Sequence, residues 1–263
     1  MLDLLDLLLL RRGIPSDDWT LTFRRIDGSS KSKVIYFLPW HTPLYVARHF
    51  GFTPLEFLAC YEMPPAIVSS TPELSVAAVK MLVADAERLL QDRDVDPVDV
   101  LVVGLSVGTY PATLFANRTG ARLCAVAAAD RADLMLWQSP AARLVRRRCV
   151  LRGVDLAHYS GVMRGLHPAQ NLAGIAAESV FILGDRDPFI PPRRRKGLLR
   201  AIRRHAPRAR VVTLDGGHVK TMIASARYQR ELASSERTPA RWHVSLPSPA
   251  FAFLRLPAGE AES

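Results

Sequence analysis

The sequence predicts an α/β protein: a mostly parallel, doubly wound sheet with helices on both faces and a small helical lid. Short runs rich in β-branched and aromatic residues alternate with longer segments of helical periodicity. Some of these runs, such as residues 34–38, are apolar throughout, as is typical of strands buried on both faces. Such alternation is the pattern of a parallel sheet whose strands are joined by crossover helices.

The expected strands are separated by recognisable turn and helix signals. Thr42-Pro43 and Thr71-Pro72 each place a capping residue before a proline suited to the first helical turn, and the second pair opens a helix to about residue 91. Gly120 is suited to end the helix that follows the central strand. The expected strands are residues 19–26, 34–38, 55–60, 98–103, 123–129, 179–184 and 210–214.

We interpret residues 1–263 as a single domain with additions at both ends and in the middle. A short apolar helix at about 2–11 either packs on the domain or covers a substrate channel. Residues 130–178 separate two strands by more than a crossover requires and predict a small lid. The prolines after about residue 235 predict an extended or partly disordered tail, 235–263.

Composition excludes several classes of protein. The chain is 49% hydrophobic and 23% charged, as in ordinary globular proteins, and no stretch approaches the roughly 20 apolar residues of a membrane span. Three cysteines, Cys60, Cys124 and Cys149, lack metal-ligand spacing and are interpreted as reduced thiols. The arginines of the first segment follow its apolar run, the reverse of a signal peptide. We expect a cytoplasmic protein with neither metal nor cofactor.

The net charge of +10 is concentrated in two helix-like segments, 146–148 and 193–210. This excess is either a solvated surface or a site of attraction to an acidic partner, such as an acyl carrier protein, a phosphorylated substrate or an anionic lipid surface. Nucleic acid is not expected, because the chain has no zinc-ligand spacing, recognition-helix signature or basic-aromatic interleaving.

A glycine-flanked serine follows the strand at 98–103. Residues 104–108 read Gly-Leu-Ser-Val-Gly, and a helix-compatible stretch comes next. Such a turn exposes the Ser106 hydroxyl at the carboxyl edge of the sheet, and glycines two residues to either side leave room for the reversal. The helix N-terminus behind it directs N–H groups to where negative charge develops during acyl transfer.

A base and an acid are placed at the ends of the last two expected strands. The strand at 179–184 leads into a loop with Asp185 and Asp187, and the strand at 210–214 leads to His218. Because the carboxyl ends of parallel strands share one edge, these side chains are expected near Ser106. A serine nucleophile needs both a proton acceptor and a group that orients that acceptor.

Together these motifs resemble the α/β-hydrolase superfamily, whose members carry serine, acid and histidine in this chain order. The resemblance covers about residues 19–232. It implies Ser106 as nucleophile, His218 as base and Asp187 as orienting acid. Members commonly place the acid three residues after a glycine and before a proline-containing turn, which favours Asp187.

Two other acids are kept as alternatives for the orienting role. Asp185 lies in the same loop, and Asp130 follows the strand after the serine, a position that some family members use.

The predicted oxyanion site departs from the family pattern. Members usually have His-Gly after the strand equivalent to 34–38, whereas this chain has Pro39-Trp40-His41-Thr42, and Pro39 has no N–H to donate. We expect the backbone N–H groups of Val107 and Trp40 to hold the oxyanion, with the His41 ring N–H as an alternative.

Further candidate substrate contacts are His41, Glu62 and Trp137. Glu62 follows a strand at the same edge, and Trp137 lies in the lid segment, where packing is the alternative role. His158 and His167, also in that segment, either contact substrate or lie at the surface.

The function that this pattern favours is hydrolysis of a carboxylic ester or thioester through an acyl-enzyme on Ser106. The alternative is a non-hydrolytic member of the same fold: an acyltransferase, another biosynthetic enzyme or a small-molecule binding protein. The expected partners are a small acyl substrate and, as a variant, an acidic acyl carrier protein.

Overall fold

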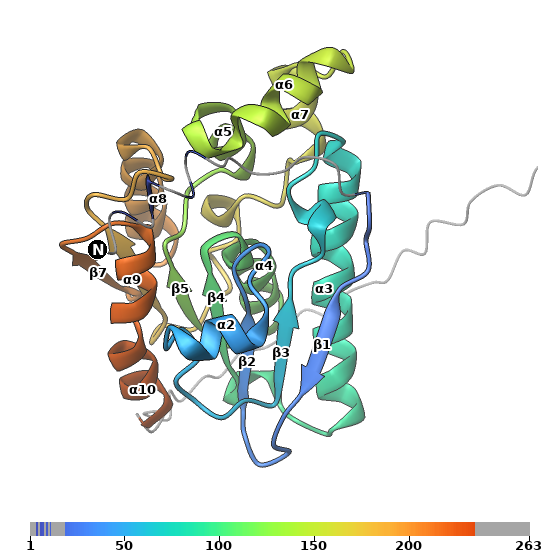
Figure 1. The fold of residues 1–263 in the computed structure, drawn as a ribbon. Helices are drawn as coiled ribbons and strands as arrows, with labels where there is room; N and C mark the ends of the chain where they lie inside the picture. Colours follow the sequence, from blue (N-terminus) through green and yellow to red (C-terminus); the bar gives the residue numbers. More distant parts are fainter. Residues whose placement is uncertain (1–3, 5, 8, 10, 12–18, 235–263) are drawn as a thin grey trace, which may run out of the picture.

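A computed structural model describes residues 19–234 and, in the N-terminal segment, residues 4, 6, 7, 9 and 11. Seven strands form one sheet in the order β1-β3-β2-β4-β5-β6-β7, parallel except for β1, which pairs antiparallel with β3 (Figure 1). The strands are β1 (Arg24–Asp27), β2 (Val34–Phe37), β3 (Ala59–Glu62), β4 (Leu101–Leu105), β5 (Arg122–Val126), β6 (Val180–Gly184) and β7 (Arg210–Leu214).

Successive side chains along the strands pack alternately into two hydrophobic cores, one on each face of the sheet. Ile35 and Phe37 of β2 enter the core beneath α3 (Pro72–Asp92), α4 (Thr109–Thr119) and α8 (Pro192–His205). Val34 and Tyr36 enter the core beneath α2 (Leu44–His49), α9 (His218–Ala224) and α10 (Ala226–Ser234). The predicted mostly parallel sheet with helices on both faces is thereby confirmed.

Three helices lie above the carboxyl edge of the sheet: α5 (Ala132–Gln138), α6 (Arg143–Leu151) and α7 (Leu156–Val162) (Figure 1). They belong to the segment that the sequence predicts as a lid. Ser139-Pro140 ends α5 and starts a new turn before α6, so this part of the segment is two helices rather than one. Short 3-10 turns occur at Pro65–Ile67, Pro97–Asp99, Ser106–Gly108, Pro140–Ala142 and Pro168–Gln170.

Six of the seven strands differ from their expected bounds, and the first and third along the chain differ most. The first begins only at Arg24, and the strand expected at 55–60 is Ala59–Glu62. Phe57 and Leu58 are buried although they precede that strand, so their hydrophobicity reflects core packing rather than sheet pairing. All three cysteines are buried with free thiols.

The described residues of the N-terminal segment are helical, whereas the predicted tail, 235–263, lies outside the described residues. Within the described part of the chain, no helix combines the length and apolar character needed to cross a bilayer.

Candidate active site

Ser106 lies on a strained turn between β4 and α4. Its φ of +53° falls in the left-handed region that residues with a side chain rarely adopt. A Cβ on Gly104 would lie 2.6 Å from the Ala112 Cβ, and a Cβ on Gly108 would lie 2.2 Å from the Phe37 carbonyl oxygen. Both glycines are therefore required for the turn to pack against α4 and the end of β2.

His218 lies between Ser106 and Asp187. It is the first residue of α9, directly after the turn that follows β7, and Asp187 lies in the loop after β6. The His218 Nε2 atom is 2.8 Å from the Ser106 Oγ, and Nδ1 is 2.6 Å from the Asp187 Oδ2. Both Asp187 and His218 are buried. Three strand ends thus bring a hydroxyl, an imidazole and a carboxylate into one hydrogen-bonded line.

The environment of His218 favours its protonated form. Burial alone would lower the pKa of the imidazole, but the charge of Asp187 and its hydrogen bond, with the charge of Asp6 added, raise this pKa above its usual 6.5. A base with a raised pKa accepts a proton more readily from a hydroxyl that it contacts.

The Asp187 carboxylate is held by its own loop. Its Oδ1 accepts hydrogen bonds from the backbone N–H groups of Phe189 at 2.8 Å and Ile190 at 3.2 Å, which leaves Oδ2 for His218. The two alternative acids have other partners: Asp185 accepts from the Gly216 backbone at 3.0 Å, and Asp130 pairs with Arg194 at 3.2 Å.

A second carboxylate reaches His218 from the N-terminal segment. Asp6 is buried and accepts from the backbone N–H groups of His218 at 2.8 Å and Val219 at 3.2 Å. The residue before α9, Gly217, supplies no side-chain cap, so Asp6 caps this helix from 212 positions away in the sequence. The predicted helix packs on the domain through Asp6 and also reaches the cavity through Leu9.

The two backbone amides expected to hold an oxyanion belong to segments that meet at Ser106. The close approach of Gly108 to the Phe37 and Leu38 carbonyls places the turn against the loop that carries Trp40. Within the described residues, neither the Val107 nor the Trp40 backbone N–H donates to another protein group. The Trp40 indole is fixed away from its own amide by a 3.2 Å hydrogen bond to the Pro65 carbonyl.

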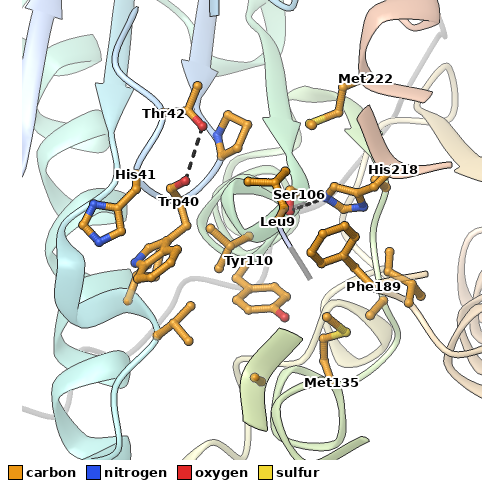
Figure 2. Close-up of a pocket in the computed structure, with 18 of the residues that line it drawn as sticks. Leu9, Trp40, His41, Thr42, Ser106, Tyr110, Met135, Phe189, His218 and Met222 are labelled. Carbon is orange, nitrogen blue, oxygen red and sulfur yellow. Dashed lines mark hydrogen bonds between the residues drawn. The ribbon is translucent and has the colours of Figure 1, made fainter. Parts of the chain in front are cut away.

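A cavity of about 690 Å³ opens beside Ser106 and is lined mostly by apolar side chains. It is bounded by the loop after β2, by α4 and by residues of the lid helices α5 and α7 (Figure 2). No Asp, Glu, Lys or Arg is among the described residues that line it. Three of the four described non-glycine residues with positive φ, namely His41, Ser106 and Ala127, line this cavity. Backbone strain is thus concentrated at one place in the molecule.

Of the three residues predicted to contact substrate, only His41 lines the cavity. His41 lines the cavity, but its ring lies beside Trp40 and points away from Ser106 (Figure 2). Glu62 caps α2 instead of lining the cavity, because its carboxylate accepts from the Leu44 backbone at 2.8 Å. Trp137 packs on the Tyr159 ring, with centroids 5.5 Å apart, in the lid core rather than at the cavity wall.

Solved structures share this architecture. An esterase/lipase from an uncultured bacterium aligns over 89% of this chain and 92% of its own, with a TM-score of 0.53 and 14% identity. An esterase from Pyrococcus furiosus aligns over 84% of this chain and 95% of its own, with a TM-score of 0.51 and 13% identity. The chain has the α/β-hydrolase fold.

An α/β-hydrolase enzyme from a lagoon-sediment metagenome gives a similar alignment, over 80% of this chain and 93% of its own, with a TM-score of 0.50 and 15% identity. No protein-family profile and no curated protein sequence matches the chain. These likenesses establish the α/β-hydrolase fold, and the activity has to be argued from the site itself.

Sequence reasoning missed two residues of this site. Asp6 stands in an apolar run far from the other motifs, and only its charge in that run marked it. Tyr110 lies four residues after Ser106, one helical turn along α4, and its spacing could have placed it on the same face as the serine. Among the described residues, no group of three or more His, Cys, Asp or Glu side chains is placed to bind a metal ion.

Proposed function

We propose that this α/β-hydrolase-fold protein is a serine hydrolase that cleaves a carboxylic ester or thioester through an acyl-enzyme on Ser106. The observation that carries the proposal is the His218 imidazole, which contacts the Ser106 hydroxyl through Nε2 and a buried carboxylate through Nδ1. This arrangement meets the requirement of a nucleophile, a base and an orienting acid.

In the first half of the reaction, the Ser106 Oγ bonds to the substrate carbonyl carbon while its proton passes to the His218 Nε2. The backbone N–H groups of Val107 and Trp40 stabilise the oxyanion of the tetrahedral intermediate. The bond to the leaving oxygen or sulfur then breaks, and His218 returns the proton to that atom. Asp187 holds the imidazole in the tautomer with its proton on Nδ1.

In the second half, water replaces the alcohol or thiol. It gives one proton to His218, its oxygen attacks the acyl carbon, and the carboxylic acid leaves as Ser106 regains its proton. The absence of charged side chains among the described lining residues favours an uncharged, largely apolar acyl group.

The direct test is turnover of p-nitrophenyl esters and matched acyl thioesters by the purified protein and by His218→Ala. We expect alkyl acyl groups to react and succinyl-type acyl groups, which carry a second carboxylate, to react poorly. His218→Ala is expected to lose about 10³-fold or more in kcat/KM, whereas His158→Ala, at an exposed lid histidine, serves as the control and keeps its activity. Ester turnover that survives His218→Ala would refute the proposal.

The substrate is further proposed to arrive on an acidic acyl carrier protein. The chain has no acid between Asp187 and Asp215, and in the described part of the chain the exposed cations of α8 have no acidic partner. Ile190, just before this helix, lines the cavity, so a carrier bound there would lie next to the site. The unpaired cations are Arg193, Lys196, Arg200, Arg203 and Arg204.

The dependence of kcat/KM on ionic strength tests whether an acyl carrier protein docks on α8. Raising ionic strength is expected to lower kcat/KM for an acyl carrier thioester while leaving a small acyl thioester unaffected, because screening weakens only the long-range attraction. Arg200→Glu with Arg204→Glu should reproduce the loss at low salt. Equal salt dependence for both substrates would contradict carrier docking.

A further inference from the structure

Tyr110 carries a hydroxyl group without a hydrogen-bond partner in the wall of an apolar cavity. The residue is 8% exposed, and in the described part of the chain no protein group contacts its hydroxyl within hydrogen-bonding distance. The hydroxyl oxygen does not belong to the fully buried polar atoms that lack a partner, so it is accessible from the cavity that Tyr110 lines. A molecule bound in the cavity can therefore reach this hydroxyl and supply its hydrogen-bond partner.

The other buried tyrosines of the cores do not share this property. Tyr36 donates to Gln229 at 2.8 Å, Tyr61 to Asp85 at 2.9 Å, and Tyr159 to the Ser69 carbonyl at 3.0 Å. The Tyr228 hydroxyl accepts a hydrogen bond from Arg227. Tyr159 is the closest comparison, because it lines the same cavity as Tyr110 yet directs its hydroxyl to a backbone carbonyl. A phenylalanine at position 110 would satisfy the packing equally well, so the hydroxyl is not explained by the core.

The position of Tyr110 directs its hydroxyl at whatever fills the cavity. The residue lies one helical turn after Ser106 on α4, and its ring is drawn between those of Trp40 and Phe189 (Figure 2). Its hydroxyl oxygen points away from Ser106 (Figure 2). A group that bonds to it therefore lies along the bound chain, beyond the carbonyl that Ser106 would attack.

We propose that Tyr110 is a specificity-determining residue that binds a hydroxyl or keto oxygen on the acyl chain of the substrate. The inference rests on the proposed hydrolase function. The acyl chain is the relevant part because it stays on Ser106 until water attacks, so the cavity beside Ser106 has to hold it. An oxygenated acyl chain supplies the missing partner, whereas a plain alkyl chain leaves the phenol unpaired.

The test compares p-nitrophenyl esters of equal chain length that are plain or carry one hydroxyl or keto group at successive positions. We expect one position to raise kcat/KM above that of the plain ester. Tyr110→Phe should lower kcat/KM for that ester by roughly tenfold or more, with little loss on the plain ester. Tyr159→Phe is the matched control, because it removes a hydroxyl from the same cavity wall that is already bonded to protein.

Three results would overturn the inference: no oxygenated acyl chain reacts faster than its plain counterpart, Tyr110→Phe lowers both substrates equally, or the preference follows oxygen in the alcohol part.

Binding to Ser106→Ala separates this inference from the hydrolase proposal, since it requires no chemistry. A hydroxy or keto fatty acid with the preferred position should raise the Tm of Ser106→Ala more than the plain fatty acid does, and Tyr110→Phe in that background should remove the difference. If the protein does not hydrolyse esters but the oxygenated fatty acid still raises the Tm more than the plain one, the hydrolase proposal is refuted and the proposed binding role of Tyr110 is retained. If the protein hydrolyses esters but the two fatty acids raise the Tm equally, only the proposed binding role of Tyr110 is refuted.

Discussion

The described residues include two groups of serine, histidine and aspartate, and the groups differ in which side chain occupies the middle. At the sheet edge His218 stands between Ser106 and Asp187. In the lid, a cluster formed by Asp133, Ser160 and His167 has the carboxylate in the middle: Asp133 accepts from Ser160 and lies 3.5 Å from the His167 Nε2.

The order of groups determines what each can do. A serine bonded directly to a carboxylate has no imidazole to take its proton, and Arg131 further neutralises Asp133 through an ion pair. Burial lowers the pKa of His167; the charge of Asp133 opposes this shift and that of Arg131 adds to it. The neighbours of His218 instead raise its pKa. We therefore propose a catalytic role for the first group and a structural role in the lid segment for the second.

Removing each serine should separate the two groups most strongly. Ser106→Ala is expected to lower kcat for ester hydrolysis on the order of 10⁵-fold, because the covalent step is lost. Ser160→Ala removes only one hydrogen bond to Asp133 and should keep kcat within about threefold of wild type, with a stability loss of about 1 kcal/mol. Comparable kcat losses in the two variants would break the comparison.

Substitutions of the two aspartates should have different effects, one on the catalytic rate and the other on the stability of the fold. Asp187→Asn is expected to lower kcat by about 10³–10⁴-fold, since an amide cannot hold the required imidazole tautomer, with a small effect on unfolding. Asp133→Asn should lower the free energy of unfolding by about 1–3 kcal/mol, because one of the two acceptor oxygens becomes an NH₂ donor and the ion pair with Arg131 is lost. Urea denaturation and steady-state kinetics measure both. Rate loss in Asp133→Asn without destabilisation would contradict the assignment.

The two histidines predict different responses to acid. His218 must be neutral to accept the proton of Ser106, and its pKa lies above 6.5, so kcat/KM should fall as pH drops through that raised value. The pKa of His167 is lowered on folding, so the unfolded chain binds the proton more readily and stability, rather than rate, should decline as pH falls below 6.5. His167→Gln should weaken the second trend and leave the first unchanged.

The smallest predicted effect comes from Asp6. Its charge adds to the raised pKa of His218, so Asp6→Asn should move the acid limb of kcat/KM to lower pH while the amide oxygen still caps α9. Asp6→Ala should also cost about 1 kcal/mol of stability through loss of the cap. Asp215→Asn is the control, because that carboxylate lies near His218 in sequence but is exposed to solvent. An unmoved limb in Asp6→Asn would show that its charge does not reach the imidazole.

The sheet and the three motifs at strand ends could be predicted from the sequence, because each is encoded by neighbouring residues. Apolar runs marked strands, and Ser106, Asp187 and His218 each follow one. The features that could not be predicted depend on the direction of side chains and on contacts between residues far apart in the sequence. Glu62 ends a strand at the predicted edge, yet its carboxylate turns to the N-terminus of α2, and strand position alone does not set that direction.

Asp6 shows the limit more clearly. No local rule connects an apolar N-terminal run to a helix that begins 212 positions later. The lid cluster is similar: Asp133 and Ser160 come together because α5 packs on α7, and His167 reaches them from the turn before Pro168–Gln170. The unpaired hydroxyl of Tyr110 is also invisible in sequence, since it is defined by the partners that the other buried tyrosines have.

Fluorophosphonate labelling followed by peptide mass spectrometry tests the central claim most directly, because the probe reacts only with a serine activated by a neighbouring base. We expect the adduct on Ser106 in wild type and in Ser160→Ala, and no adduct in Ser106→Ala or His218→Ala. An unlabelled wild-type protein, or an adduct on Ser160, would contradict the assignment of chemistry to the sheet edge.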